Sequence, residues 1–288
     1  MNIWYLYFLL PVILFPAIST INVLFGRQLG AKKMSLYRQL TVTIVGSPLL
    51  IGILQKPELL EKHALIIVLC GFFGAMYLTT AFYAMNLTLV GISRSFVAVS
   101  RTVAGFVIGY FFFQESISFY DILWTGVIFL GVFILSQVSG ESISKKDIMG
   151  ILASLLAGVI FSINTLIFKL FAKDFPAIEA AYLLECSSLL FILVFIIITK
   201  KKSLKESLSI QPQKIWILFM SAPFLLLASY GLAKSVNLIP FYIFNTLFIL
   251  VLIISMILSW IFLHEKFTLK QLIAMWIMVG GCGIVILF

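Results

Sequence analysis

Charged residues are scarce in this chain of 288 residues. Only 11% of its residues are Asp, Glu, Lys or Arg, whereas 62% are hydrophobic and the mean hydropathy is +1.16. A soluble domain has about 25% charged residues, so this composition excludes an ordinary soluble protein and indicates a polytopic membrane protein. The net charge of +9 does not indicate nucleic-acid binding. The basic residues gather in short loops, where they orient a membrane chain and contact anionic lipids.

Residues of metal and hydrolytic chemistry are equally few. The sequence has two histidines, at loop edges, and three cysteines, inside apolar runs and without a CxxC pair. It contains no HExxH motif, no nucleotide-binding Walker A motif and no loop long enough for an ATPase domain. These absences predict no metal, no catalytic residue and no cofactor. They make an intramembrane enzyme the least favoured function, and they leave ion gradients, exchange or the substrate's own gradient as energy sources for transport.

Long apolar runs fill most of the chain. Each is close to the 20 residues that a membrane-spanning helix needs, and short polar breaks separate them. The predicted spans are 3–25, 36–55, 64–85, 91–113, 120–138, 148–171, 176–199, 214–233, 238–263 and 269–288. The first run lacks a basic leader and a cleavage site, so it is predicted to be a span and not a signal peptide. The predicted fold is an all-α integral membrane protein with ten transmembrane helices.

The two halves of the chain repeat. Residues 111–135 align with 261–285 at a constant offset, which places Glu115 over Glu265, and Asn22 similarly aligns with Asn164. Each half has five predicted spans, and because five is odd the second half must enter the membrane inverted. Inverted repeats are typical of secondary transporters, whose substrate site lies at the repeat interface near the membrane midplane. The predicted domains are a first five-helix repeat over 1–140 and a second over 145–288.

Two matching motifs carry a family resemblance. The chain reads FFFQESIS at 111–118 and IFLHEKFT at 261–268, each followed by a helix with glycines, and Tyr37-Arg38-Gln39 begins the second span. This pattern resembles the EamA-type members of the drug/metabolite transporter superfamily. The resemblance implies ten helices and transport of small molecules, among them amino acids, nucleotide sugars, choline and drugs. One position departs from the pattern, because the family often has proline or a small residue where this chain has Arg101.

Two arginines lie inside the fourth span. Arg94 and Arg101 are seven residues apart and therefore share one face of a helix, two turns apart. A central arginine costs about 2.5–3.5 kcal/mol on insertion scales, so it needs a partner, a cavity or a ligand. Arg101 is too deep to reach either surface and is predicted to line the transport pathway. For Arg94, snorkelling to the membrane interface is the alternative.

Glu185 is the deepest acid in the sequence. One interpretation is an ion pair between Arg101 and Glu185 that holds helices together. The other is a substrate site, in which Arg101 binds a carboxylate or phosphate while Glu185 binds a proton or an amine. Both interpretations stay open.

Other polar residues complete the predicted site. Asparagines within the spans are candidate substrate ligands, with interhelical hydrogen bonds as the alternative. Tyrosines within the spans are candidate cavity walls or interfacial anchors. The substrate-binding predictions include Asn22, Asn164, Asn245, Tyr83 and Tyr230, with Tyr77 and Tyr242 as further wall candidates. Arg38, Glu115 and Glu265 are assigned to the structural signature, and the two glutamates are expected to cap the helix that follows each of them.

Charge bias predicts the orientation. Most of the 20 Lys and Arg residues lie in loops that follow odd-numbered spans, most densely at 200–214. The positive-inside rule therefore places both termini outside the cytoplasm, whereas members of the superfamily are usually drawn with both termini inside.

The favoured function is a secondary active transporter, exporter or importer, in the cell membrane. It would move a small polar metabolite, such as an amino acid or a related anionic or zwitterionic compound, by alternating access, with a proton or counter-substrate as coupling partner. The first alternative is a cationic substrate such as choline or a polyamine, held by Glu185 and tyrosines. The second is a membrane scaffold that transports nothing. Monomer and homodimer both stay open.

Overall fold

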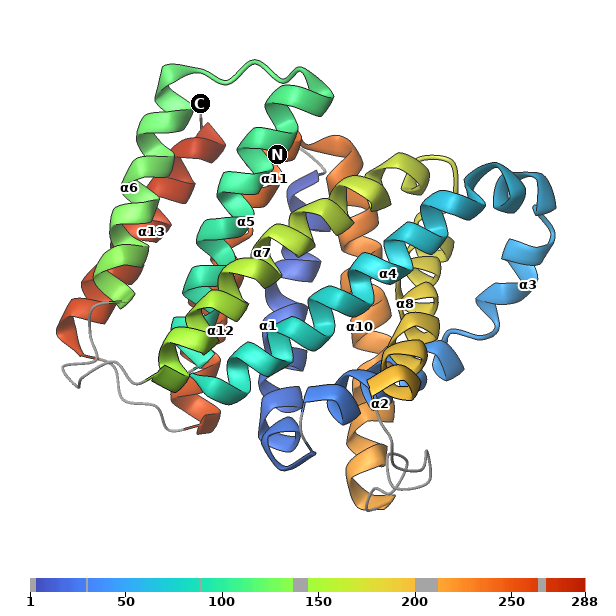
Figure 1. The fold of residues 1–288 in the computed structure, drawn as a ribbon. Coiled ribbons are helices and arrows are strands. Elements are labelled where there is room, and N and C mark those ends of the chain that lie inside the picture. Colours follow the sequence, from blue (N-terminus) through green and yellow to red (C-terminus); the bar gives the residue numbers. More distant parts are fainter. Residues whose placement is uncertain are drawn as a thin grey trace.

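The computed structural model describes residues 4–29, 31–88, 90–136, 145–199, 212–263 and 268–287, and these form helices joined by short turns, without a strand. The helices are α1 (Trp4–Leu29), α2 (Ala31–Val45), α3 (Leu49–Leu54), α4 (Pro57–Leu87), α5 (Val90–Phe113), α6 (Phe119–Ser136), α7 (Lys145–Ala172), α8 (Ala177–Thr199), α10 (Pro212–Leu238), α11 (Phe241–Leu247), α12 (Ile249–Leu263) and α13 (Leu269–Leu287). Figure 1 shows their arrangement.

Several helices are long and apolar enough to cross a membrane. Within the described residues, six stretches meet this criterion: Pro57–Leu87, Ile92–Phe113, Lys145–Ala172, Ala177–Ile198, Ile215–Leu238 and Phe241–Phe262. Three shorter apolar helices lie at Leu6–Asn22, Phe119–Ile134 and Leu272–Gly281. The outer surface carries large apolar side chains such as Phe111, Phe112, Ile198 and Trp276. An exposed apolar surface of this kind is suited to lipid, so the prediction of an all-helical, multi-pass membrane protein is confirmed.

The predicted second span, 36–55, is wrong as one continuous helix. The structure has α2 and α3 instead, separated by a turn at Gly46, Ser47 and Pro48. Pro48 has no N–H and a fixed φ, which breaks the helical hydrogen bonding. At Gly46 a Cβ atom would meet the ring of Tyr182, so this close approach requires glycine.

Two other boundaries differ from the sequence prediction. Helix α4 begins at Pro57, seven residues before the predicted start, with proline in its first turn, a position where its missing N–H costs nothing. The predicted span 238–263 is interrupted at Phe248, which separates α11 from α12. The Phe248 side chain lines a central cavity.

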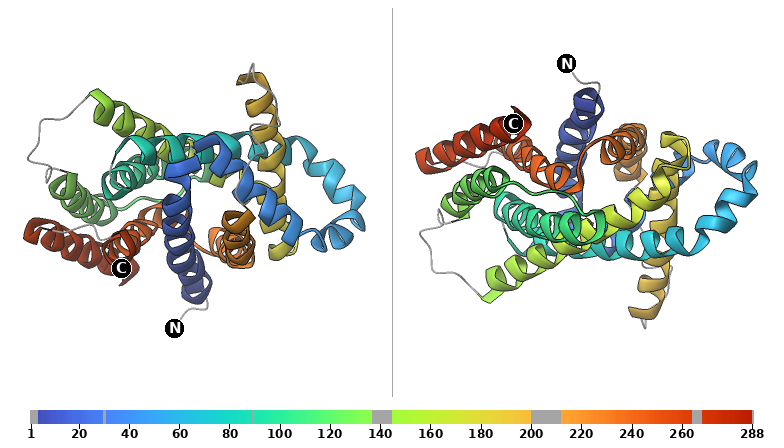
Figure 2. Two further views of the ribbon diagram at one scale, coloured as in Figure 1. Left: turned by 90° about the horizontal axis from the view of Figure 1, so that it is seen from below. Right: turned by 90° about the horizontal axis from the view of Figure 1, so that it is seen from above.

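The helices pack in pairs that join the two halves of the chain. Helix α4 packs along α7 and α1 along α10, while α5 packs on α7 and α12 on α1. Helices α6 and α13 pack together at one edge of the molecule, as Figure 1 and both views of Figure 2 show. The start of α1 and the end of α13 lie on the same side, at the top of Figure 1.

Glycines mark the closest helix contacts. A Cβ atom at Gly105 would meet Asn245, and one at Gly109 would meet Glu115 and Tyr242, so the G-x-x-x-G of α5 packs against α11. A Cβ atom at Gly158 of α7 would meet Ser100 and the backbone of α5. Small residues let helix backbones approach each other in membrane proteins. These contacts hold α5 firmly between α7 and α11.

Candidate binding cavity

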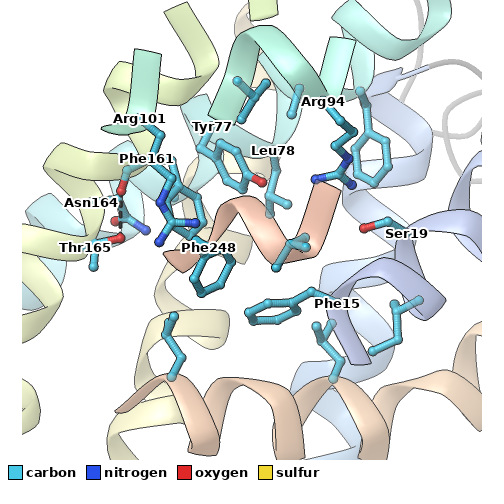
Figure 3. Close-up of a pocket in the computed structure, with 18 of the residues that line it drawn as sticks. Phe15, Ser19, Tyr77, Leu78, Arg94, Arg101, Phe161, Asn164, Thr165 and Phe248 are labelled. Carbon is cyan, nitrogen blue, oxygen red and sulfur yellow. Dashed lines mark hydrogen bonds between the residues drawn. The ribbon is translucent and has the colours of Figure 1, made fainter. Parts of the chain in front are cut away.

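A cavity of about 110 Å³ lies in the centre of the helix bundle. Residues from α1, α2, α4, α5, α7, α8, α10 and α12 line it, and most of them are apolar. Its polar lining residues are Ser19, Asn22, Arg38, Tyr77, Arg94, Arg101, Asn164, Thr165, Glu185 and Ser188. Figure 3 shows part of this lining, with aromatic rings between the two arginines of α5. An apolar cavity with a few convergent polar groups is the usual form of a small-molecule site.

Arg101 is buried at this cavity, with 4% of its surface exposed. Its Nε donates a hydrogen bond to Asn245 Oδ1 over 2.8 Å. The guanidinium carbon lies 4.0 Å from the ring centroid of Phe161 and 3.6 Å from that of Phe248, which are cation–π distances. Its Nη2 has no hydrogen-bond partner. Arg101 is therefore held by an amide and two rings, with donor capacity left for a ligand.

Asn245 positions Arg101 and does not line the cavity. Its Nδ2 donates to the Phe241 carbonyl over 2.8 Å, which directs Oδ1 toward the guanidinium. Ser162 on α7 donates to the backbone carbonyl of Arg101 over 2.8 Å. Helices α5, α7 and α11 together fix the arginine, so the substrate-ligand prediction for Asn245 becomes a supporting role in this geometry.

Glu185 is bound by partners other than Arg101. Its Oε2 accepts from Gln39 Nε2 over 2.6 Å and from Arg38 Nη1 over 3.3 Å, and its Oε1 accepts from Ser229 Oγ over 2.7 Å. The interpretation of an Arg101–Glu185 ion pair is therefore wrong, because Arg38 supplies the positive charge. Gln39 of the first half of the chain and Glu185 of the second half are thus in direct contact.

Arg94 also lines the cavity, at the end opposite Arg101 in Figure 3. Its side chain is partly buried and its Nε has no hydrogen-bond partner. Among the described residues, no carboxylate forms an ion pair with Arg94 or Arg101. Two of the three arginines at the cavity thus lack a neutralising partner from the described chain.

Both repeat-related asparagines reach the cavity. Asn22 on α1 and Asn164 on α7 line it, and Asn22 Oδ1 has no hydrogen-bond partner. Asn164 Oδ1 accepts a hydrogen bond from the Cys70 thiol on α4 over 3.4 Å, which is the interhelical contact that the sequence left as an alternative. The placement of both residues is consistent with a ligand contact, which stays a prediction.

The tyrosines divide into two groups. Tyr77 lines the cavity, where its ring stacks edge-to-face on Phe161. Tyr83 is 44% exposed on the outer surface, and Tyr230 packs against Tyr7; neither lines the cavity. Phe161 and Phe248 were not predicted from the sequence, because nothing distinguishes them from the other 26 phenylalanines until the fold places them beside Arg101.

Glu115 caps a helix of the other half of the chain. Its carboxylate accepts hydrogen bonds from the backbone N–H groups of Phe241 and Tyr242 at the start of α11. The expectation that it caps the helix that follows is wrong. Helix α6 is capped by Ser118, whose Oγ accepts from the Asp121 N–H over 3.2 Å while the Asp121 carboxylate accepts from the Ser118 N–H. Glu265, which aligns with Glu115 in the sequence, lies outside the described residues.

Fold, surface and cavity define a multi-pass integral membrane protein with a buried polar site. Residues 148–287 match the EamA-like transporter family, so the second half of the chain is similar to the members of this family. The family is part of the drug/metabolite transporter superfamily, so the resemblance predicted from the two glutamate motifs is confirmed. It is a family of membrane transporters of small molecules and not of enzymes.

Comparison of folds gives a match over nearly the whole chain. A crystal structure of a protein aligns with a TM-score of 0.71, covers 98% of this chain and 96% of its own, and shares 17% sequence identity. Identity at this level shows a common fold alone. A search of curated protein sequences found no match.

Proposed function

We propose that this protein is a secondary active transporter of a small metabolite with an anionic group, working by alternating access in the cell membrane. Arg101 is the observation that carries the proposal. A buried guanidinium without a carboxylate partner is costly in a membrane, and here it faces a central cavity with an unused donor. A carboxylate or phosphate of the substrate would complete its hydrogen bonding.

The proposed architecture has ten spans in two inverted repeats, 1–140 and 145–288. The pattern of helix contacts supports this architecture. In two related repeats, α1 would correspond to α7 and α4 to α10. The symmetry then requires that the contact of α4 with α7 be matched by a contact of α10 with α1, and both contacts are present. The pairs α6 with α13 and α2 with α8 each join corresponding elements. In such a fold the substrate site lies between the repeats, where Arg101 and Glu185 stand.

The hydrogen bonds that the Glu185 carboxylate already accepts argue against a cationic substrate. Its carboxylate already accepts hydrogen bonds from Gln39, Arg38 and Ser229, so it has little capacity for an ammonium group. The charge available to a ligand is that of the arginines. This balance favours an amino acid or a related anionic or zwitterionic compound over choline or a polyamine. A proton that couples transport would bind at Glu185, the only acid among the described lining residues.

A ligand screen followed by flux measurement tests the proposal. Purified protein is screened by thermal shift against a metabolite library, since a ligand of the folded state raises the melting temperature. The compounds found are then assayed for uptake into proteoliposomes with wild-type protein, Arg101→Gln, and Lys146→Gln, an exposed charge far from the cavity lining. We expect anionic compounds to stabilise and to be transported, with Arg101→Gln alone losing both effects.

Three results would contradict the proposal. Unchanged ligand affinity and flux in Arg101→Gln would show that Arg101 does not bind the anionic group of the substrate. Selective stabilisation by choline or polyamines would establish the cationic alternative. Absence of flux for every stabilising compound would favour the scaffold alternative.

A further inference from the structure

Four charged side chains line the cavity, and only two of them neutralise each other. Arg38 and Glu185 form an ion pair at 3.3 Å, and the remaining hydrogen-bonding positions of Glu185 are taken by Gln39 and Ser229. Arg94 and Arg101 have no ion-pair partner among the described residues. The described lining thus has an excess of two positive charges. Because charge is expensive in a low-dielectric interior, the bound ligand is the natural source of two negative charges.

The two arginines have a defined spacing. They lie on one helix, seven residues apart, which corresponds to about 10.5 Å along the axis and nearly two full turns. Both therefore project from the same face of α5. In Figure 3 their guanidinium groups approach the cavity from opposite ends. Each has a nitrogen without a hydrogen-bond partner, Nε in Arg94 and Nη2 in Arg101.

The wall between the arginines is largely apolar. Val97 and Ala98 line it from α5, and the rings of Phe15, Tyr77 and Phe248 line it from other helices, with the Tyr77 hydroxyl as a polar group among them. A strongly polar middle segment of a ligand would lose its hydration there and recover few hydrogen bonds. A hydrocarbon or aromatic middle segment would gain burial instead.

We infer that the cavity binds an elongated dianion, with one acidic group at Arg101, the other at Arg94 and an apolar segment between them. An α,ω-dicarboxylate or an aromatic diacid has this chemistry. The inference rests on the proposed transport function and narrows its substrate from an anionic or zwitterionic compound to one with two acidic groups. Arg94, in this arrangement, is a specificity-determining residue that selects the second negative charge.

A matched set of three ligands tests directly whether the site recognises a second acidic group on the ligand. Suberate has a carboxylate at both ends, octanoate has one, and 8-aminooctanoate replaces one carboxylate with an ammonium group. Binding is measured on the full chain in lipid nanodiscs by calorimetry and thermal shift, with glutarate as a shorter diacid. We expect suberate to bind at least about tenfold more tightly than either analogue, the factor for one added charge-assisted hydrogen bond.

Variants locate each carboxylate. Arg94→Gln and Arg101→Gln should each reduce suberate affinity about tenfold or more. Octanoate has one carboxylate, so its affinity should depend on only one of the two arginines. Arg94→Lys and Arg101→Lys keep the charge and show whether a loss reflects folding, because they should retain the preference for suberate over 8-aminooctanoate. Lys146→Gln, an exposed residue, should behave as wild type.

The results separate this inference from the proposed function. One outcome is that octanoate or 8-aminooctanoate binds as tightly as suberate in a manner that depends on Arg101. This result would overturn the inference of a dianion site and would leave the proposed anion transporter unaffected. Unchanged suberate affinity in Arg94→Gln, or no binding by any diacid of the set, overturns the dianion as well. If suberate binds equally well to wild type and to Arg101→Gln, both the dianion site and the anion site of the proposed function fail.

Discussion

Single polar groups in this protein act across the two halves of the chain. Arg101 of the first half is oriented by Asn245 of the second, Glu185 of the second half is neutralised by Arg38 of the first, and Glu115 caps α11. In a membrane an unsatisfied polar group finds no water to replace a lost partner. Each of these contacts therefore fixes how the halves meet as well as satisfying its own donors and acceptors.

The cap made by Glu115 gives a prediction at the residue scale. Glu115→Ala removes the acceptor for two N–H groups at the start of α11, and an unsatisfied buried donor costs about 1–3 kcal/mol. We expect a lower melting temperature for Glu115→Ala and a smaller decrease for Glu115→Gln, which retains a carbonyl oxygen. Glu61→Ala, at an exposed site on α4, is the control in the same thermal melts. Equal melting temperatures of the Glu115→Ala and Glu61→Ala variants would show that the carboxylate does not hold α11.

At the scale of elements, α5 is placed by its contacts with small residues. Gly158 of α7 lies against Ser100 and the backbone at Arg101, so the position of the cavity arginine depends on the close approach of α5 and α7. A side chain at this contact would push α5, and with it Arg101, away from Phe161.

The contact between α5 and α7 predicts opposite outcomes for two glycine substitutions. Gly158→Ala should lower both the melting temperature and the affinity for anionic ligands, because its Cβ has no space. Gly126→Ala is the matched control, since a Cβ there meets nothing within 4 Å; alanine is also the better helix former by about 1 kcal/mol, so this variant should melt at or above the wild-type temperature. Normal ligand affinity in Gly158→Ala would show that the contact is not needed to position Arg101.

A second contact between elements has a pH dependence. Asp174, in the turn after α7, accepts hydrogen bonds from Lys62 over 2.9 Å and from His63 over 2.8 Å, both near the start of α4. These hydrogen bonds, that of Lys62 above all, hold the pKa of Asp174 below its ordinary value. Because the pKa is lowered in the folded state, the stabilisation is present above the ordinary aspartate pKa and is lost as pH falls through the lowered one.

The predicted measurement is the melting temperature of wild type and Asp174→Asn over a range of pH. Wild type should melt at the higher temperature at neutral pH, and the difference should shrink below about pH 4, the region where an unperturbed aspartate titrates. Glu61→Gln, without such a contact among the described residues, serves as the control. A difference between wild type and Asp174→Asn that persists undiminished in acid would rule out the carboxylate charge as its source.

At the scale of the whole molecule, the start of α1 and the end of α13 lie on the side opposite the end of α8 and the start of α10 (Figure 1). The most basic stretch of the sequence, 200–214, follows the end of α8 in the chain. A compartment-sensitive reporter at either terminus should report a non-cytoplasmic position, and one inserted in 200–211 a cytoplasmic position. Cytoplasmic signals from both termini would show that this chain has the orientation usually drawn for the superfamily, with both termini inside, and not the one that its charge bias predicts.

Composition and pattern alone determined the class of this protein. Apolar runs of membrane length and the scarcity of charge sufficed to predict a helical membrane protein, because lipid imposes one secondary structure on any long apolar segment. Two F-x-x-x-E-x-[ST] motifs predicted the transporter family that the second half of the chain matches. Because charge is costly in lipid, the sequence also indicated Arg101, Arg94 and Glu185 as candidate site residues, and all three line the cavity.

Only the tertiary structure decided which groups meet. Arg101 pairs with Asn245 and two phenylalanine rings and not with Glu185, and Glu115 caps α11 and not α6. Asn245 is 144 residues from Arg101, and Phe241 at the start of α11 is 126 residues from Glu115. The free energy that selects such partners comes from how helices pack, which no local pattern records. The same packing leaves Arg94 and Arg101 without counter-charges among the described residues, and that imbalance leads from the class of transporter to the charge of its proposed substrate.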